Sequence, residues 1–228
     1  DSSLTIHTAT VIGAGAMGSG IAQVLAQAGV RVFLYDTKDE ALDRAMAKLG
    51  STMDRLVEKG RITTEEREGI LGRIQPILYL REAADSDLVI EAIFESLEAK
   101  RSVFTLIDDV VRPDCILATN TSSLSIAAIS SGVSHPERLI GLHFFNPAPL
   151  MPLVEIVPSL ATDPAVVARC VAQVQAWGKT GVVAKDTPGF IVNRVARPYY
   201  AEALNILEEG MADVSTIDWA MTQLGGFR

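Results

Sequence analysis

Residues 10–18 read Thr-Val-Ile-Gly-Ala-Gly-Ala-Met-Gly, and this stretch decides the fold. A short apolar run leads into glycines at positions 13, 15 and 18, and residues 21–26 continue with helical character. The pattern predicts a strand, a glycine-rich turn and a helix, in which backbone N–H groups at the helix N-terminus face a pyrophosphate. Gly13 allows the tight turn, Gly15 lets phosphates approach the backbone, and Gly18 lets the helix pack closely on the strand. We expect Ala16 and Met17 to contact the same ligand.

An acidic residue follows at the spacing that a dinucleotide site requires. Residues 30–35 predict a second strand, and Asp36 stands at its end, 18 residues after Gly18. A carboxylate at this place hydrogen-bonds the hydroxyls of an adenosine ribose. Lys38 is the only cation near Asp36, and no arginine is there to hold a 2′-phosphate, so we expect NAD rather than NADP. The alternative is a glycine-rich turn without a ligand, which the strand, helix and acid together disfavour.

The composition excludes several classes of partner. The chain has 228 residues, 48% of them hydrophobic, which is enough for a large core. The formal net charge of −8 argues against nucleic acid and against an anionic membrane surface. The apolar stretches are too short to span a membrane. Cys115 and Cys170 indicate neither a disulfide framework nor a metal site, so we expect a cytoplasmic protein without a metal.

Strands and helices are expected to alternate as far as residue 187. The expected strands cover residues 30–35, 74–80, 88–93, 115–119, 138–144, 153–157 and 180–184, and the expected helices cover 38–59, 63–71, 97–111 and 164–177. This alternation is typical of a doubly wound, mostly parallel α/β sheet. We therefore assign residues 1–187 to one dinucleotide-binding domain of the Rossmann type.

The sequence changes character after Pro188. A long helix is expected to about Glu209, with Pro198 inside it, and a second helix from Asp213 to Leu224. About 40 residues are few for an independent core. Residues 188–228 are therefore expected to be the first helices of an all-α domain in a truncated chain.

His143 and Glu155 are the residues that we expect to carry chemistry. His143 ends a predicted strand, and ligands bind at the carboxyl ends of strands in open α/β sheets. An imidazole near a hydride acceptor can take the proton of an alcohol as the hydride leaves. Glu155 interrupts an apolar strand, where an unpaired carboxylate is costly, and a pair with His143 would fix the imidazole tautomer. The spacing leaves open a satisfied core histidine and an unrelated glutamate.

The chain resembles the L-3-hydroxyacyl-CoA dehydrogenase family over nearly its whole length. The matching segments are residues 11–23, 89–93, 120–124, 141–147, 153–156 and 186–194. Two of their sequences, His-Phe-Phe-Asn-Pro at 143–147 and Asp-Thr-Pro-Gly-Phe at 186–190, are highly specific. The resemblance implies NAD as cofactor and the reversible oxidation of an (S)-3-hydroxyacyl-CoA to a 3-ketoacyl-CoA, as in fatty-acid β-oxidation.

The resemblance also implies roles for individual residues. His143 corresponds to the family's catalytic base and Glu155 to its carboxylate partner. Ser122 and Asn193 correspond to catalytic and substrate-binding residues beside the substrate 3-oxygen. The implied cofactor contacts are Gly13, Gly15, Ala16, Met17, Gly18, Asp36, Glu95, Lys100, Asn120, Ser122 and Asn146. Thr52 and Lys59 correspond to residues that bind the CoA moiety.

Five of these positions also have an alternative explanation that needs no ligand. Lys59 and Lys100 are also compatible with solvated helix charges, Ser122 with a helix cap, Asn193 with a polar position on a buried helix face, and Asn120 with a strand end. Ser96 also departs from the family, which most often has asparagine there.

The resemblance leaves two competing functions and one expectation about assembly. One alternative is an NAD-dependent dehydrogenase of a hydroxyacid without CoA, such as gulonate. The other is a non-catalytic, crystallin-like binding protein, which the presence of His143, Glu155, Ser122 and Asn193 disfavours. Family members dimerise through further helices, so we expect a homodimer for the full-length protein and impaired dimerisation for this chain.

Overall fold

The computed structural model describes residues 5–227 and divides into two compact units, Asp1–Pro188 and Gly189–Arg228. The outer ends of the two predicted domains, residues 1–4 and 228, lie outside the described residues. Each unit is described by itself below. In the described part of the chain, no helix combines the length and the apolar character needed to cross a membrane.

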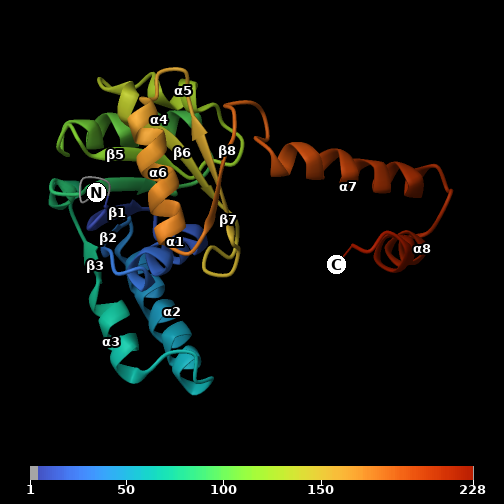
Figure 1. Ribbon diagram of the computed structural model, residues 1–228, viewed down its shortest axis with the longest axis horizontal. Helices are drawn as coiled ribbons and strands as arrows, with labels where there is room; N and C mark the ends of the chain where they lie inside the picture. Colours follow the sequence, from blue (N-terminus) through green and yellow to red (C-terminus); the bar gives the residue numbers. More distant parts are fainter. Residues whose placement is uncertain (1–4, 228) are drawn as a thin grey trace. The chain divides into compact units, whose positions relative to one another are not determined.

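One sheet of eight strands runs through the first unit in the order β3-β2-β1-β4-β5-β6-β7-β8 (Figure 1). The strands are β1 (Thr8–Ile12), β2 (Arg31–Tyr35), β3 (Ile74–Ile77), β4 (Leu88–Glu91), β5 (Ile116–Thr119), β6 (Leu139–Phe144), β7 (Leu153–Pro158) and β8 (Thr180–Val183). All neighbours are parallel except β6 and β7, which are antiparallel. The chain builds outward from β1 to β3 and then returns to β4 on the other side of β1. This reversal confirms the predicted Rossmann-type sheet and places its ligand crevice at the carboxyl ends of β1 and β4.

Helices of the first unit cover both faces of this sheet. They are α1 (Ala16–Gln27), α2 (Asp39–Glu58), α3 (Thr64–Gly72), α4 (Leu97–Asp108), α5 (Ile126–Ser130) and α6 (Pro164–Ala176). Residues of α1 and α6 share one core cluster with Val11 of β1 and Ile90 of β4. The alternating residue Val89 is also fully buried but lies outside that cluster, as do Phe104 of α4 and Ile129 of α5. The parallel strands are therefore buried on both sides, as their apolar sequences require.

Several element ends differ from the sequence predictions. The strand predicted over 74–80 ends at Ile77, and a 3₁₀ turn follows at Leu80–Ala83. The helix predicted to residue 111 ends at Asp108, because β-branched valines and then Pro113 follow. By contrast, the start of α3 is as predicted, since Thr63 and Glu66 form a reciprocal capping box.

The second unit consists of two helices and a final turn. Helix α7 (Val192–Glu208) continues through Pro198, and α8 (Val214–Trp219) begins after Asp213, whose side chain caps it. A π-helical turn follows at Ala220–Leu224. None of the described residues of α7 or α8 is buried.

The glycine-rich turn after β1 is built around two positions that tolerate no side chain. Gly13 has φ +107°, and a Cβ there would lie 2.6 Å from the carbonyl oxygen of Ala92. A Cβ on Gly18 would lie 1.7 Å from the carbonyl oxygen of Gly13. A Cβ on Gly15 would meet nothing within 4 Å, so this position faces open space. Gly13 and Gly18 therefore shape the turn, while Gly15 leaves room beside it.

The close approach at Gly18 generates a prediction about folding. Gly18→Ala should lower the free energy of unfolding by about 3 kcal/mol, because its neighbour is rigid backbone that cannot move aside cheaply. Gly50→Ala is the matched control, since a Cβ at Gly50 within α2 meets nothing within 4 Å. The free energy of unfolding of the control should rise by up to about 1 kcal/mol, because alanine has a higher helix propensity than glycine. Urea unfolding of both variants measures the difference, and equal stabilities would contradict this packing.

Candidate active site

Asp36 joins the end of β2 to the glycine-rich turn. Its Oδ2 accepts a hydrogen bond of 2.8 Å from the backbone N–H of Ala14, and its Oδ1 accepts one of 3.0 Å from that of Lys38. Gly13 N–H donates to the carbonyl oxygen of Tyr35 at 2.8 Å. These bonds fix the predicted ribose-binding carboxylate beside the predicted phosphate-binding turn.

A cavity of about 790 Å³ opens beside this turn, which is a size suited to a cofactor. Its lining includes the turn, Asp36, residues 92–94 after β4 and parts of α2 and α4. The first N–H groups of α1 face no side-chain cap, because its N-cap is Gly15. Uncapped N–H groups at a helix N-terminus suit a phosphate. The residues present therefore fit a dinucleotide.

Three basic side chains also line the cavity, those of Lys38, Arg44 and Lys48. Of the three, only Lys38 is predicted from the sequence to lie near the cofactor. Arg44 and Lys48 extend from α2, four residues apart and therefore on one face of the helix. The periodicity of α2 would have revealed them, since Ala41 and Ala45 line the same cavity. They add positive charge to the cavity that Asp36 also lines.

His143 and Glu155 are brought together by the antiparallel pairing of β6 and β7. The two residues are direct partners in the register, and His143 Nδ1 lies 2.8 Å from Glu155 Oε1. Glu155 is fully buried and the His143 side chain is 8% exposed. The ring of Phe145 lies 4.4 Å from the imidazole, centroid to centroid. A carboxylate oxygen accepts, so Nδ1 carries the hydrogen of this bond.

Asn120 ties the end of β5 to the end of β6. Its Oδ1 accepts a 2.8 Å hydrogen bond from the N–H of Phe144, the residue after His143. Asn120 N–H in turn donates to the carbonyl oxygen of Glu91 at 2.8 Å. Asn146 is exposed and precedes a cis peptide bond to Pro147. Asn120 therefore does more than end a strand, while its cofactor contact and that of Asn146 stay predictions.

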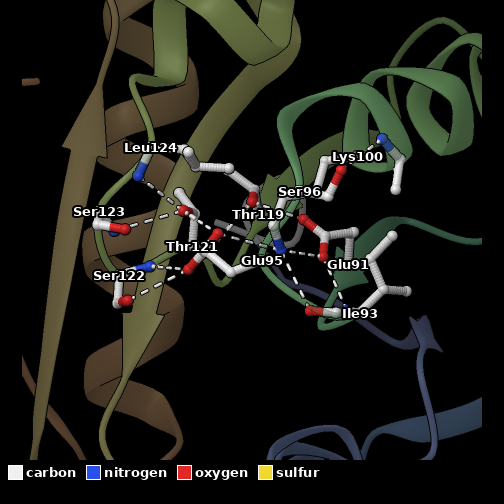
Figure 2. Close-up of polar contacts among 11 residues, drawn as sticks. Glu91, Ile93, Glu95, Ser96, Lys100, Thr119, Thr121, Ser122, Ser123 and Leu124 are labelled. Atoms are coloured by element: carbon white, nitrogen blue, oxygen red, sulfur yellow. Dashed lines mark hydrogen bonds and ion pairs between the residues drawn. The ribbon is translucent and has the colours of Figure 1, made fainter.

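Ser122 and Glu95 lie together at the same edge of the sheet (Figure 2). Glu95 Oε2 accepts from the backbone N–H of Ser122 at 3.1 Å and from its hydroxyl at 3.2 Å. Burial alone would raise the pKa of Glu95, but hydrogen bonds from Thr121 and Ser122 and the charge of Lys100 hold it below its ordinary value. Glu95 is therefore ionised at neutral pH and orients Ser122.

The alternative interpretation of Lys100 as a solvated helix charge is wrong. It is 2% exposed, and its Nζ lies 2.6 Å from Glu91 Oε2 and 3.6 Å from Glu95 Oε1. The helix cap proposed for Ser122 is also wrong, because Ser125 caps α5 and Asp186 accepts from the N–H groups of Ile126 and Ala127. Asp186 thus anchors α5 across 60 residues of sequence.

Three further predicted residues, Lys59, Thr52 and Asn193, belong to helices α2 and α7 or their ends. Lys59 is exposed just beyond the end of α2, and Thr52 is half-buried two turns earlier. Their spacing places both on one side of the helix axis. Asn193 belongs to α7 of the second unit. The roles of these three residues stay predictions.

Residues 8–187 match the family model for the NAD-binding domain of 3-hydroxyacyl-CoA dehydrogenase, and residues 189–228 match the model for its C-terminal domain. The chain therefore belongs to the 3-hydroxyacyl-CoA dehydrogenase family, and its first unit is that family's NAD-binding domain.

Three relatives illustrate the likeness. The chain is 47% identical to 3-hydroxyadipyl-CoA dehydrogenase of Escherichia coli K12, over 98% of this chain and 47% of that protein. It is 42% identical to a probable 3-hydroxybutyryl-CoA dehydrogenase of Bacillus subtilis, over 96% of this chain and 76% of that protein. The crystal structure of (S)-3-hydroxybutyryl-CoA dehydrogenase from Ralstonia eutropha superposes with a TM-score of 0.95 at 37% identity, over 98% of this chain and 79% of that one. The chain thus spans about half the length of the Escherichia coli relative.

The position of Asp36 generates a prediction about cofactor choice. Asp36→Ala should weaken NADH binding by about 10- to 100-fold, the loss expected for hydrogen bonds to a charged group. The variant should also prefer NADH over NADPH less strongly, because Lys38, Arg44 and Lys48 remain to attract the 2′-phosphate of NADPH. Asp39→Ala, which removes an exposed carboxylate three residues away, is the control. NADH fluorescence titration measures both, and unchanged NADH affinity in Asp36→Ala would rule out the ribose contact.

Proposed function

We propose that the protein reversibly oxidises (S)-3-hydroxyacyl-CoA thioesters to 3-ketoacyl-CoA thioesters with NAD. The observation that carries this proposal is the buried His143–Glu155 hydrogen bond, at the edge of the sheet where the glycine-rich turn also lies. Relatives named for 3-hydroxybutyryl-CoA and 3-hydroxyadipyl-CoA support the substrate class.

The proposed mechanism has two components, the cofactor and the His143–Glu155 pair. NAD, when bound, would supply the acceptor for the hydride at C3 of the substrate. His143 takes the hydroxyl proton at Nε2, the ring nitrogen that carries the lone pair when Nδ1–H points at Glu155. Glu155 holds this tautomer and offsets the positive charge that develops on the imidazole. In the reductive direction the imidazolium returns the proton to the 3-oxygen.

Ser122 and Asn193 are proposed to meet the substrate 3-oxygen. The hydroxyl hydrogen of Ser122 points at Glu95, since a carboxylate can only accept. Ser122 must therefore turn this hydrogen away from Glu95 before it can polarise a ketone. Thr52 and Lys59 are proposed to hold the CoA moiety from α2.

A homodimer through the helical domain is also proposed. Helix α7 carries large apolar side chains that are exposed in this chain, among them Val195, Leu204 and Leu207. Such a surface favours association, because burying it removes apolar area from water. We further propose that the protein works in the cytoplasm.

The proposed base makes a quantitative prediction. His143→Gln should lower kcat for acetoacetyl-CoA reduction by about 10²–10⁴-fold, the usual contribution of a positioned general base. Glu155→Gln should lower kcat while the affinity for NADH stays unchanged. His135→Gln is the matched control, because His135 Nδ1 also pairs with a glutamate, Glu137, but on the surface. Turnover of each variant, made in the whole protein, is measured from the change in NADH absorbance.

Two results would contradict the proposal. Near-normal turnover in His143→Gln would remove His143 as the base. Faster oxidation of free hydroxyacids such as gulonate than of the CoA thioesters would instead favour the alternative dehydrogenase without CoA.

A further inference from the structure

Five polar residues form a closed ring of hydrogen bonds and ion pairs at the carboxyl ends of β4 and β5 (Figure 2). Glu91 Oε1 accepts from the hydroxyl of Thr119 at 2.7 Å, and Glu91 Oε2 accepts from Lys100 Nζ at 2.6 Å. Thr119 Oγ1 accepts from the N–H of Thr121 at 3.2 Å, and Thr121 donates its hydroxyl to Glu95 at 2.6 Å. Lys100 Nζ, 3.6 Å from Glu95, closes the ring.

Among the five residues of the ring, Glu95 is exposed to solvent and the other four are buried. Glu91 is fully buried, Lys100 is 2% exposed and the Glu95 side chain is 37% exposed. Glu91 also accepts from the N–H of Ile93 at 2.8 Å, so its carboxylate is well satisfied. Two carboxylates share one ammonium, and the buried carboxylate is the nearer. Lys100 is therefore neutralised mainly from the inside, and Glu95 keeps its oxygens for other donors.

Those other donors belong to the segment that carries Ser122. Glu95 holds the N–H and hydroxyl of Ser122, while Thr121 Oγ1 accepts from the N–H groups of Ser123 and Leu124. Residues 121–124 lie between β5 and α5, so side chains replace the ladder bonds that a strand would provide. The geometry of this segment therefore depends on the ring.

We propose that Glu91 is a positioning residue for Ser122: by neutralising Lys100 from inside the protein, it leaves Glu95 free to hold the Ser122 amide and hydroxyl at the ligand edge of the sheet. The role in catalysis rests on the proposed function, but the structural role does not. Glu91 acts through Lys100, Thr119 and Glu95, and it lies too deep to touch a ligand itself.

Removal of the charge on Glu91 has a definite physical consequence. In Glu91→Gln the buried ammonium of Lys100 keeps only one anionic partner within 4.0 Å among the described residues, Glu95. A buried charge without a close counter-ion is costly, so Glu95 should move toward Lys100. That movement takes its Oε2 away from Ser122. The expected result is a loosened segment at residues 121–124.

Hydrogen exchange in the ligand-free protein tests this proposal. Glu91→Gln should lower the protection of the Ser122, Ser123 and Leu124 amides at least about tenfold beyond any loss shared by the whole chain, and weaken NADH binding by a similar factor. The matched control is Asp108→Asn, which breaks the similarly buried pair of Asp108 and Arg138 at the other end of α4. The control should lower stability without a selective effect on residues 122–124.

A rescue variant separates positioning from simple destabilisation. Glu91→Gln with Lys100→Met removes both charges, so nothing draws Glu95 inward, and the protection of Ser122 should return. Thr119→Val opens the ring without burying a charge, and it should loosen the same amides even if Glu91→Gln does not fold.

Three outcomes would overturn the proposal. The first is unchanged hydrogen-exchange protection of the amides at 122–124 in Glu91→Gln or Thr119→Val. The second is a similar selective loss of this protection in Asp108→Asn. The third is failure of the added Lys100→Met substitution to restore the protection. Because exchange is measured without ligand, absence of acyl-CoA turnover would overturn the proposed function alone.

Discussion

The antiparallel pairing of β6 and β7 is the constraint on which the proposed chemistry depends. It places His143 directly opposite Glu155 in a sheet that is otherwise parallel. A shift of one residue in this register would turn one of the two side chains to the other face of the sheet. The pairing also buries Glu155 completely, so its bond to the imidazole is formed away from competing water. One strand reversal therefore creates the proposed base.

The registers of β4 with β5 and of β5 with β6 gather the polar residues of the site on one face of the sheet. Glu91 is paired with Thr119, and Thr119 with Gly141, which lies two residues before His143. Side chains two residues apart share a face, so the ring around Glu91 and the His143–Glu155 pair lie on the same side of the sheet. Asn120 lies between them: its backbone N–H donates to the carbonyl oxygen of Glu91, and its side-chain Oδ1 accepts from the N–H of Phe144. The ring around Glu91 and the His143–Glu155 pair thus flank the segment that carries Ser122.

Much of this could be predicted from the sequence, where a local pattern carries the information. The glycines at the start of α1 and Asp36 after β2 were sufficient for the nucleotide turn. The glutamate within an apolar strand at 155 indicated a buried carboxylate, but its pairing with His143 followed only from the family resemblance. The same reasoning applied to Glu91, in the apolar run 88–93, would have predicted a second buried carboxylate. Lys100 stands four and seven residues before the buried residues Phe104 and Ile107, a spacing that predicts burial. The capping of α5 by Asp186 joins residues 60 apart, and no local pattern encodes it.

The tautomer of His143 tests the central claim most directly. In ¹⁵N NMR of protein labelled at histidine, above the pH at which the imidazole is protonated, Nδ1 should carry the hydrogen and Nε2 the lone pair. Glu155→Gln should make this preference weaker, because an amide oxygen is a poorer acceptor than a carboxylate. A neutral imidazole protonated at Nε2 in the unaltered protein would contradict the account, since that nitrogen could not then accept the proton of an alcohol.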